Sequence, residues 1–340
     1  MKKQYKIAVI PCDGIGKDVI RATMIVLNAI NEVADGFSLE FRHLDAGQTA
    51  IEKHGEAFPK ETHDGIESSD ATLFGASDTP GVLGELKRGF DLYANIRPIK
   101  ALPGTNALQP NADFVIFREN MEGLHSRVGW IDRDYFVNCR IFTRKIYERF
   151  LPSAFEYAIK EGRKKVTFTH KAHVLTYTDK PMREMFYEVA KAYPQIEAED
   201  MTHDTCGMFI AMEPERLDVV VTENSIGDIL SDVGAGTIGG KGYAYSGCIG
   251  DRHAYFEPIH GTARKYEDKN IVNPSAAIMC GKMMFDYLGE KDTALWILQA
   301  LSDVLREGKV RTYHMGGEAS TTDFAEAVAQ KIRERKDSYA

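Results

Sequence analysis

Hydrophobic residues along the chain form short unbroken runs that alternate with longer stretches of helical spacing. The short runs predict buried strands, and they occur at residues 6–10, 38–44, 71–75, 113–117, 164–170 and 217–224. A glycine-bearing turn at 12–16 leads into a helix that continues to residue 30. Further helical patterns occur at 143–161, 178–192, 225–233, 274–288, 292–307 and 321–336. Strands that alternate with helices predict an α/β chain with a mainly parallel sheet.

The length and composition exclude several classes of protein. With 340 residues the chain is about twice the usual size of one domain, so we expect two domains or one bilobed unit. Hydrophobic residues make up 44% and charged residues 27%, which excludes a disordered, collagen-like or coiled-coil chain. The net charge of −8 argues against a nucleic-acid partner. No apolar run reaches the roughly 18 residues of a membrane span, so we expect no membrane partner. No signal peptide is evident and the cysteines form no CxxC pair, so we expect a cytoplasmic location.

Two acids with helical spacing, Asp228 and Asp232, are candidate metal ligands. Four residues apart on a helix, their carboxylates lie on one face, one turn apart. Mg²⁺ or Mn²⁺ suits such a pair, because hard cations choose carboxylate oxygens. The spacing alone favours the alternative, an acidic first turn that stabilises a helix N-terminus.

Three basic residues follow strand-like runs. Lys171 comes where a strand ends, a common place for active-site residues in α/β folds, and is a candidate general base. Arg97 and Arg118 are candidates to bind substrate carboxylates through their guanidinium forks. A surface lysine, and structural ion pairs with acids such as Asp91 or Glu119, are the alternatives.

One loop, EPIHGTARKY at 257–266, has backbone amides that could meet a ribose or phosphate, although a plain turn is also possible. The early CDGIG turn resembles a phosphate loop but lacks the GxGxxG and P-loop patterns. We therefore exclude a standard dinucleotide fingerprint.

The order of six motifs gives a more specific indication, namely IPCDGIGKDVI, DLYANIRP, FRENMEG, THKAHVL, TENSIGDILSD and EPIHGTARKYEDKNIVNPSAAI. From about residue 6 to 330 the chain resembles the β-decarboxylating dehydrogenases, the isocitrate/isopropylmalate dehydrogenase family. The resemblance implies an isocitrate/isopropylmalate dehydrogenase-like fold, with two α/β lobes that share a continuous sheet, and not a standard Rossmann fold. The large cofactor-binding lobe would take residues 1–98 and 247–340, and the small lobe with the dimer interface 99–246. A homodimer or higher oligomer with shared active sites is implied.

Residue by residue, the resemblance assigns roles to the candidate sites. Asp204, Asp228 and Asp232 would bind Mg²⁺ or Mn²⁺, with Asp204 and Lys171 supplied by the partner subunit. Arg97 and Arg118 would bind the malate carboxylates. The cofactor residues would be Asn224, His260, Gly261, Thr262, Ala263, Lys265, Tyr266, Asn273 and Tyr313.

The implied reaction is metal-dependent oxidation and decarboxylation of a 3-substituted malate-type hydroxy acid, such as isocitrate, homoisocitrate or isopropylmalate, with NAD or NADP. Lys171 would help to remove the hydroxyl proton while hydride leaves C2. A dehydrogenase without decarboxylation, as in tartrate dehydrogenases, and a non-catalytic regulatory subunit of isocitrate dehydrogenase are the alternatives. The second fits less well, because Lys171 and the three acids are kept.

The chain departs from the family pattern at substrate contacts. Lys87 stands where the first substrate arginine is usual, with Arg88 beside it, and His173 replaces an asparagine. His125 replaces the tyrosine acid and becomes the candidate proton donor and substrate ligand. Segment 78–86 lacks the residues that isocitrate and isopropylmalate enzymes use. These changes indicate either a divergent substituted malate or drift around an ordinary one.

The candidate nucleotide is NADP, with NAD as the alternative. NAD-preferring relatives usually carry an acid after the HG turn, where this chain has Lys265 and Tyr266. These two residues suit a 2′-phosphate, and Tyr313 is a candidate third contact, although no matching arginine follows it and Gly317 lies nearby.

Overall fold

The computed structural model describes residues 3–339, which form two compact units. Unit 1 contains the described residues up to Asp91, Leu102–Ala107 and those from Gly239 onward. Unit 2 contains Leu92–Ala101 and Leu108–Ile238. No helix among the described residues is long and apolar enough to cross a membrane.

The strands of unit 1 pair side by side in a sheet that is parallel except at one end. The last two strands of the series pair antiparallel. In spatial order the strands are β2 (Phe37–His43), β1 (Lys3–Cys12), β3 (Ala71–Ala76), β12 (Ala254–Pro258) and β11 (Tyr245–Ile249).

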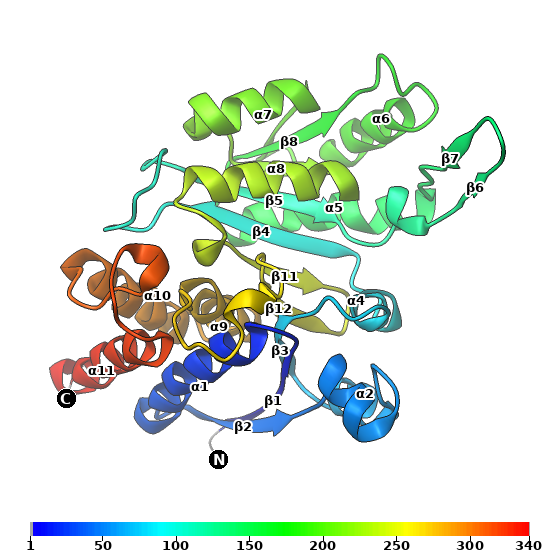
Figure 1. Ribbon diagram of the computed structural model, residues 1–340. Coiled ribbons are helices and arrows are strands. Elements are labelled where there is room, and N and C mark those ends of the chain that lie inside the picture. Colours follow the sequence, from blue (N-terminus) through cyan, green and yellow to red (C-terminus); the bar gives the residue numbers. More distant parts are fainter. Residues whose placement is uncertain (1–2, 340) are drawn as a thin grey trace. The chain divides into compact units, whose positions relative to one another are not determined.

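Four long helices form two layers in unit 1. The helices α1 (Gly16–Val33) and α9 (Ser275–Leu288) pack against the sheet, and α10 (Lys291–Glu307) and α11 (Thr321–Tyr339) pack against them (Figure 1). Helix α1 buries one apolar stripe, as its 3.6-residue spacing predicts. Two short helices, α2 (Gln48–His54) and α3 (Lys60–Glu67), connect β2 to β3.

The large sheet of unit 2 also has five strands, flanked by two pairs of helices. In spatial order the strands are β4 (Ala94–Lys100), β5 (Asp113–Glu119), β10 (Val219–Thr222), β8 (Lys165–His170) and β9 (Glu197–Thr202). The helices α5 (Arg144–Lys160) and α6 (Asp179–Ala190) pack together, as do α7 (His203–Met212) and α8 (Asn224–Thr237). Figure 1 shows α8 in front of the sheet and α5 behind it. A separate hairpin is formed by β6 (Gly129–Ile131) and β7 (Phe136–Asn138).

The unit bounds differ by a few residues from those expected from the sequence, 1–98 with 247–340 and 99–246. Strand β4 pairs antiparallel with β5 along its whole length, so a division after residue 98 would cut a paired strand. The segment before β11 lies in unit 1, which moves the second division to residue 239. The roles of the two lobes, in cofactor binding and dimer formation, stay predictions.

Candidate active site

The parallel strands of unit 2 bring several candidate residues to one edge of their sheet. Strands β5, β10, β8 and β9 all run in the same direction, so their carboxyl ends lie at the same edge. Arg118 is near the end of β5, Asn224 follows β10, Lys171 follows β8, and Asp204 follows β9. The topology therefore explains why residues far apart in sequence could serve one site.

Two buried arginines converge on Asp228. Arg97, on β4, donates from NH1 to the Asp228 carboxylate at 3.0 Å and to Ser231 Oγ at 2.7 Å. Arg118 donates to the same Asp228 oxygen. The two arginine residues are only 5% and 2% exposed, whereas the Asp228 side chain is 51% exposed. Two buried guanidinium groups therefore bind one carboxylate, that of Asp228, which solvent can still reach.

Asn224 lies beneath Arg118 and not on the surface. Its Oδ1 accepts hydrogen bonds from Arg118 Nε at 3.2 Å and from NH2 at 2.6 Å. Its Nδ2 is buried and has no hydrogen-bond partner among the described residues. A buried donor left without a partner is costly, and a bound ligand could satisfy it.

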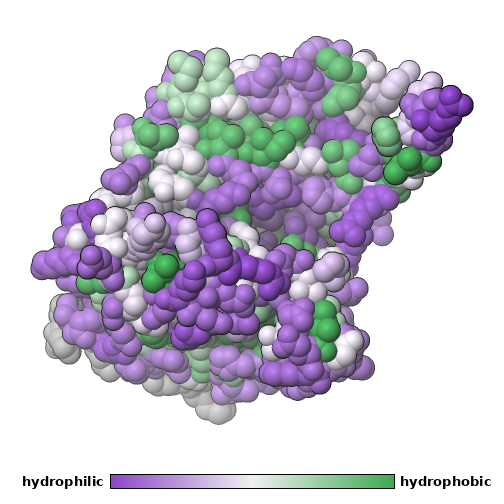
Figure 2. All heavy atoms as spheres, in the orientation of Figure 1, coloured by the Kyte–Doolittle hydropathy of each residue, from purple (hydrophilic) through white to green (hydrophobic). Residues whose placement is uncertain are grey.

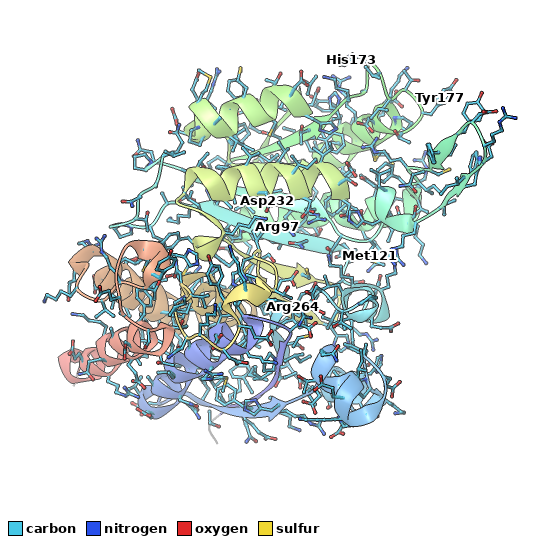
Figure 3. The ribbon with its side chains drawn as sticks, viewed as in Figure 1. Arg97, Met121, His173, Tyr177, Asp232 and Arg264 are labelled. Atoms are coloured by element: carbon cyan, nitrogen blue, oxygen red, sulfur yellow. The ribbon has the colours of Figure 1, made fainter. Side chains whose placement is uncertain are left out.

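The three expected metal ligands are not gathered within one chain. Asp228 and Asp232 lie one turn apart on α8, and Figure 3 labels Asp232 on that helix and Arg97 on β4. Within the part of the chain that the structure describes, no group of three His, Cys, Asp or Glu residues is placed to hold a metal ion. Asp204 is paired elsewhere in unit 2.

That pairing joins the two candidate catalytic residues Lys171 and Asp204. The Lys171 ammonium donates from Nζ to Asp204 Oδ1 at 2.6 Å, with side chains that are 31% and 68% exposed. Hydrogen bonds from Lys171 and Thr202 hold the pKa of the Asp204 carboxyl well below its usual range. In this chain the pair is open to solvent, and available to another molecule.

A buried ionic network that the sequence did not reveal supports Lys171. Asp179, at the start of α6, accepts the Lys171 backbone N–H at 2.8 Å and an NH1 hydrogen bond from Arg140 at 2.5 Å. Burial raises the pKa of Asp179, but hydrogen bonds from His203, Lys171 and Arg140 outweigh it, and the pKa is lowered to about 2. Arg140 also lies 3.5 Å from Glu223, whose carboxylate caps the N-terminus of α8. The network thereby connects the Lys171 segment to the helix that carries Asp228.

His125, the candidate proton donor, lies in unit 2 on a short 3₁₀ turn, Leu124–Ser126, and is exposed. Glu119, from the same FREN motif, is fully buried at the end of β5 and accepts the backbone N–H groups of Met121 and Glu122. Burial raises the pKa of Glu119 to about 7, against these hydrogen bonds. A carboxyl group that titrates near neutrality therefore lies next to Arg118 in the chain.

Most candidate nucleotide residues lie in unit 1, where His260 to Tyr266 form the loop after β12, whereas Asn224 belongs to unit 2. His260 Nε2 is buried without a hydrogen-bond partner among the described residues, and burial lowers the pKa of this imidazole. Gly261 is exposed, Thr262 is buried, and Ala263 has a left-handed backbone with φ of +37°. The loop thus offers one buried ring nitrogen and several accessible backbone groups.

Four aromatic or cationic residues contact one another at the end of this loop. The Lys265 ammonium lies 4.7 Å from the centre of the Tyr266 ring, and His314 meets that ring edge-on at 5.2 Å. Tyr313, on the turn Tyr313–Met315, is 61% exposed and contacts His314 in turn. The predicted Lys265, Tyr266 and Tyr313 are therefore connected through a residue, His314, that the sequence did not single out.

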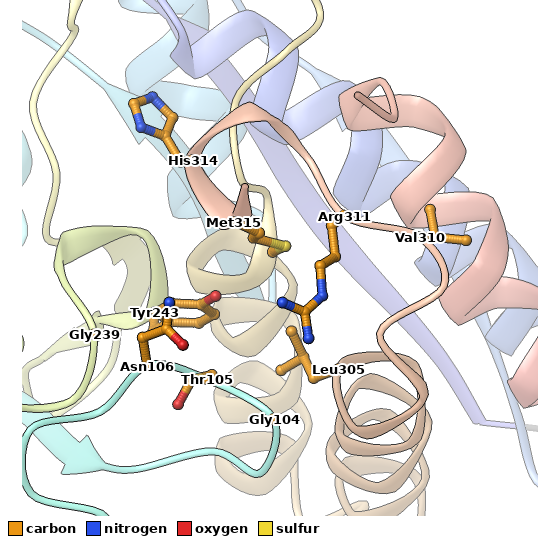
Figure 4. A pocket seen from close by; sticks show the side chains of 10 residues that line it. All are labelled: Gly104, Thr105, Asn106, Gly239, Tyr243, Leu305, Val310, Arg311, His314 and Met315. Carbon is orange, nitrogen blue, oxygen red and sulfur yellow. The ribbon is translucent and has the colours of Figure 1, made fainter. Parts of the chain in front are cut away.

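A cavity of about 40 Å³ lies beside this turn. Its lining includes Tyr243, Arg311 and His314, and Figure 4 shows Arg311 reaching into it. Asn273, a candidate adenosine residue, is buried and hydrogen-bonds to Tyr243, whose pKa is raised by its burial. Two residues that line the cavity, Tyr243 and His314, therefore contact candidate nucleotide residues, namely Asn273 and Tyr266.

Lys87 lies in a one-turn π-helix, Glu85–Gly89, also in unit 1, and is partly exposed. It belongs to the segment that precedes β4 and follows the turn at 78–81.

A family model for isocitrate/isopropylmalate dehydrogenase matches residues 6–328. The chain belongs to the isocitrate/isopropylmalate dehydrogenase family. It is 44% identical to the 3-isopropylmalate dehydrogenase of Methanothermobacter thermautotrophicus over 338 residues, which cover 98% of this chain and 100% of that one. It is 42% identical to the isocitrate/homoisocitrate dehydrogenase of Thermus thermophilus, with 97% and 99% covered. The crystal structure of isocitrate dehydrogenase from Methylococcus capsulatus matches with a TM-score of 0.89 and 37% identity, over 97% of this chain and 99% of that one.

Membership of the isocitrate/isopropylmalate dehydrogenase family confirms two expectations. The fold is the α/β fold of that family and not a standard Rossmann fold. The chain is an oxidoreductase that acts on a CH–OH group, a decarboxylating dehydrogenase. The family depends on NAD or NADP and on Mg²⁺ or Mn²⁺, acts on small hydroxy acids, and its members are usually dimers.

Proposed function

We propose that this enzyme oxidises and decarboxylates a 3-substituted malate-type 2-hydroxy acid, with NADP as the preferred nucleotide and Mg²⁺ or Mn²⁺ as the metal. The observation that carries the proposal is the convergence of two buried arginines, Arg97 and Arg118, on the half-exposed carboxylate of Asp228. Buried guanidinium groups need anionic partners, and a substrate with two carboxylates supplies them. His125 and Lys87 would complete the substrate contacts.

The residues present fit a divalent metal. Asp228 and Asp232 are one turn apart on α8 and offer only oxygen donors, which Mg²⁺ and Mn²⁺ prefer. We assign Asp204 of a second subunit as the third ligand, because within one chain Asp204 pairs with Lys171. When bound, the metal supplies Lewis-acid polarisation of the substrate oxygens.

The residues of the protein would do the remaining work. Arg97 and Arg118 would bind and orient the substrate carboxylates, so that the carboxylate on C3 can leave as CO₂ once C2 has been oxidised to a ketone. Lys171, fixed through its backbone N–H by Asp179, would separate from Asp204 and release one ammonium proton to solvent, and as a neutral amine it would then accept the hydroxyl proton. His125 delivers a proton to C3.

The nucleotide also has a suitable place. Within the described part of the chain, His260 Nε2 in unit 1 and Asn224 Nδ2 in unit 2 are among the buried polar atoms without a hydrogen-bond partner, and each suits an adenosine or ribose group. Lys265, Tyr266 and Tyr313 would meet the 2′-phosphate of NADP, since a cation and two phenols suit a phosphate and offer no acid to ribose hydroxyls.

A homodimer, or a higher oligomer built from it, is the proposed active form. The helices α7 and α8 carry exposed apolar side chains, among them Met212 at 67% and Ile229 at 60%, and Figure 2 shows hydrophobic residues gathered over α8. The β6–β7 hairpin exposes Ile131 and Phe136 at 77% and 86%. Such apolar surface is typical of a protein interface. The five free cysteines agree with the cytoplasmic location that the sequence predicts.

A substrate screen tests the reaction. The purified chain is mixed with isocitrate, homoisocitrate, isopropylmalate, tartrate and unsubstituted malate, each with NADP or NAD and Mn²⁺, and absorbance of the reduced nucleotide is followed. We expect reduction with at least one 3-substituted malate, released CO₂ in equal amount, and loss of activity after chelation. Reduction without CO₂ would favour the tartrate-like alternative, a dehydrogenase that does not decarboxylate. The observation behind that alternative is that His125 replaces the usual tyrosine. No reduction with any acid would contradict the proposal.

A complementation experiment tests the shared sites. Lys171→Met and Asp228→Asn should each inactivate a homodimer. In a mixed dimer one site carries both changes and the other carries neither, so mixing the unfolded chains and refolding them should restore about a quarter of normal activity. Refolding of wild-type chain alone gives the reference yield. If each chain used its own Lys171, mixing would restore nothing.

A further inference from the structure

Three segments of unit 1 meet around the turn that follows β1. The buried carboxylate of Asp13 accepts hydrogen bonds from Gln48 N at 2.9 Å, from Ser77 Oγ and Thr79 Oγ1, both at 2.8 Å, and from Thr79 N at 3.3 Å. Its pKa is lowered, because these hydrogen bonds outweigh the effect of burial. Asp13 therefore fixes Ser77 and Thr79, the two neighbours of Asp78, while leaving the Asp78 side chain exposed.

The candidate nucleotide loop is fixed to the same turn. Ile15 N donates to Thr262 O at 2.8 Å. Gly14 has φ of +54°, and a Cβ atom there would lie 2.1 Å from Thr262 O, so only glycine permits this approach. The ring of Tyr266 packs against the buried cluster that contains Ile15 and Val19. The turn thus holds both the start of the candidate substrate segment 78–86 and the candidate nucleotide loop 260–266.

An ion pair between Asp78 and Arg264 joins the candidate substrate segment directly to the candidate nucleotide loop. Asp78 Oδ2 accepts hydrogen bonds from Arg264 Nε and from Thr262 Oγ1, both at 2.8 Å, and Asp78 Oδ1 accepts from Arg264 NH2. The guanidinium therefore holds the carboxylate by two parallel bonds, the geometry that gives an Arg–carboxylate pair directional specificity. Arg264, labelled in Figure 3, and Asp78 are each about half-exposed, at 47% and 45%.

We propose that the Asp78–Arg264 pair is a positioning contact that couples the candidate substrate segment 78–86 to the candidate nucleotide loop 260–266. The proposal rests on the proposed function, which assigns ligands to these two segments. Neither residue is required to touch the hydroxy acid. The pair fixes the segment relative to the loop, so that occupancy of one ligand site favours the productive arrangement of the other. The turn holds the two segments through separate contacts of Asp13 and Ile15, and Arg264 also lies 4.0 Å from Asp13, but the Asp78–Arg264 pair is the forked ion pair that joins the segments directly.

The chain offers a matched control for this contact. Arg333 and Glu32 also form a forked pair, with Nε at 2.8 Å and NH2 at 3.4 Å, and their side chains are 36% and 55% exposed. This pair joins α11 to α1 and lies in no candidate ligand segment. Arg333→Gln therefore measures the effect of losing an equivalent surface pair.

Hydrogen exchange of the ligand-free protein tests the coupling directly. Asp78→Asn should speed exchange at Tyr266 and Glu267, whose N–H groups bond within the nucleotide loop. Arg264→Gln should speed exchange at Thr79, whose N–H bonds to Asp13 and Ser77. Arg333→Gln should change neither segment. If either variant affects only its own segment, the two are not coupled and the proposal is wrong.

Kinetics test the consequence for catalysis. Asp78→Asn and Arg264→Gln should each raise the KM values of both the hydroxy acid and the nucleotide about 3- to 10-fold, while kcat changes less than about 2-fold. The double variant should be much less impaired than the product of the two single effects, because the shared ion pair is already lost in each single variant. Unchanged KM values, a change in only one of them, or multiplied effects in the double variant would overturn the positioning role. If the wild-type chain turns over no acid, the proposed function fails, and the exchange experiment still decides whether the segments are coupled.

Discussion

Arg97 and Asp228 share a 3.0 Å hydrogen bond in which a buried guanidinium donates to a half-exposed carboxylate. Arg118 donates to the same oxygen. Asp228 therefore neutralises two buried cations in the structure described here, although the sequence assigns it to a metal. Both roles are compatible if the carboxylates of a substrate take over the arginines, since the Asp228 oxygens are then available for the metal. Before substrate and metal bind, the ion pairs with Asp228 would hold the two arginines in place and would keep the Asp228 carboxylate beside them.

Replacing the two acids of α8 should separate these roles. Asp228→Asn and Asp232→Asn should each lower kcat/KM on the order of 100-fold with Mn²⁺, because each removes a charged metal ligand. Asp228→Asn should also cost about 1–3 kcal/mol of unfolding free energy, since it removes the counter-charge of two buried arginines. Steady-state rates across a Mn²⁺ titration and denaturant unfolding measure the two effects.

Ser231→Ala is the control for these substitutions. It removes the 2.7 Å hydrogen bond from Arg97 to Ser231 without removing an acid. It should alter the KM of the hydroxy acid and leave the Mn²⁺ concentration for half-maximal activity unchanged. Near-normal turnover and Mn²⁺ dependence in both asparagine variants would exclude the assigned metal site.

The sequence predicted most elements of the fold, because hydrophobic spacing is a local property. The expected helix at 274–288 is α9, Ser275–Leu288, and the expected strand at 71–75 is β3, Ala71–Ala76. Strand β9 was missed because EAEDMT is polar and lies at the end of the strand order, where it buries no side chain fully. Strand β4 was missed because ANIRPIK contains both a proline and an arginine.

Contacts between distant residues were not predictable in this way. Arg140 pairs with Asp179 across 39 residues of chain, and Arg264 pairs with Asp78 across 186. Such pairs depend on which strand ends meet, and neither composition nor spacing contains that information. The family resemblance supplied ligand positions, but it gave no indication of these supporting pairs.

Nucleotide preference should depend on Lys265 and Tyr266. The double substitution Lys265→Asp with Tyr266→Ile should lower the ratio of kcat/KM for NADP to that for NAD by at least about 10-fold, because it replaces a cation with an acid that can accept ribose hydroxyls. Tyr266→Phe is the control, since it removes the hydroxyl and keeps the ring that packs against Ile15 and Val19. A wild-type enzyme that already uses NAD better than NADP would contradict the assignment.

An added arginine at Gly317 is not expected to strengthen NADP binding. A Cβ atom at that position would lie 2.2 Å from the Arg311 carbonyl oxygen, so any side chain forces the backbone to move. The turn at 313–317 therefore has no room for an arginine side chain at residue 317, and Tyr313 stays the candidate nucleotide contact from this turn.

The stability of the protein should fall as pH rises towards neutrality because of Glu119. Burial raises the pKa of this carboxyl to about 7, whereas in the unfolded chain it is about 4.3. Between these values the folded state holds a proton that the unfolded state has released. The stabilisation is therefore complete below about pH 4 and is lost as pH rises through 7, by about 4 kcal/mol in total. Denaturant unfolding from pH 5 to pH 8 measures it.

Glu119→Gln should remove most of this pH dependence, because the amide does not titrate. Glu161→Gln, at an exposed glutamate after α5, should keep the wild-type dependence. If Glu119→Gln and wild type lose the same stability between pH 5 and pH 8, Glu119 is ionised in the folded protein across that range and the effect of its burial is compensated elsewhere.

His125 should deliver the proton to C3 in place of the usual tyrosine. Its exposed position on the turn Leu124–Ser126 leaves the imidazole accessible to substrate and solvent. An imidazole titrates at about 6.5 in the absence of other influences, far closer to neutrality than a phenol at about 10. The rate should therefore fall as pH rises through the range in which an imidazolium loses its proton.

His125→Phe should lower kcat on the order of 10- to 100-fold, with a smaller change in KM, because general acid catalysis is lost while the arginine contacts to substrate remain. His125→Tyr should restore part of the rate and shift the falling limb of the pH profile upward. The alternative is that His125 only hydrogen-bonds to the substrate and water protonates C3; KM would then rise while kcat and its pH profile stayed the same. Product analysis in D₂O decides whether C3 is fully protonated. A phenylalanine variant with near-normal turnover and fully protonated, decarboxylated product would exclude His125 as the donor.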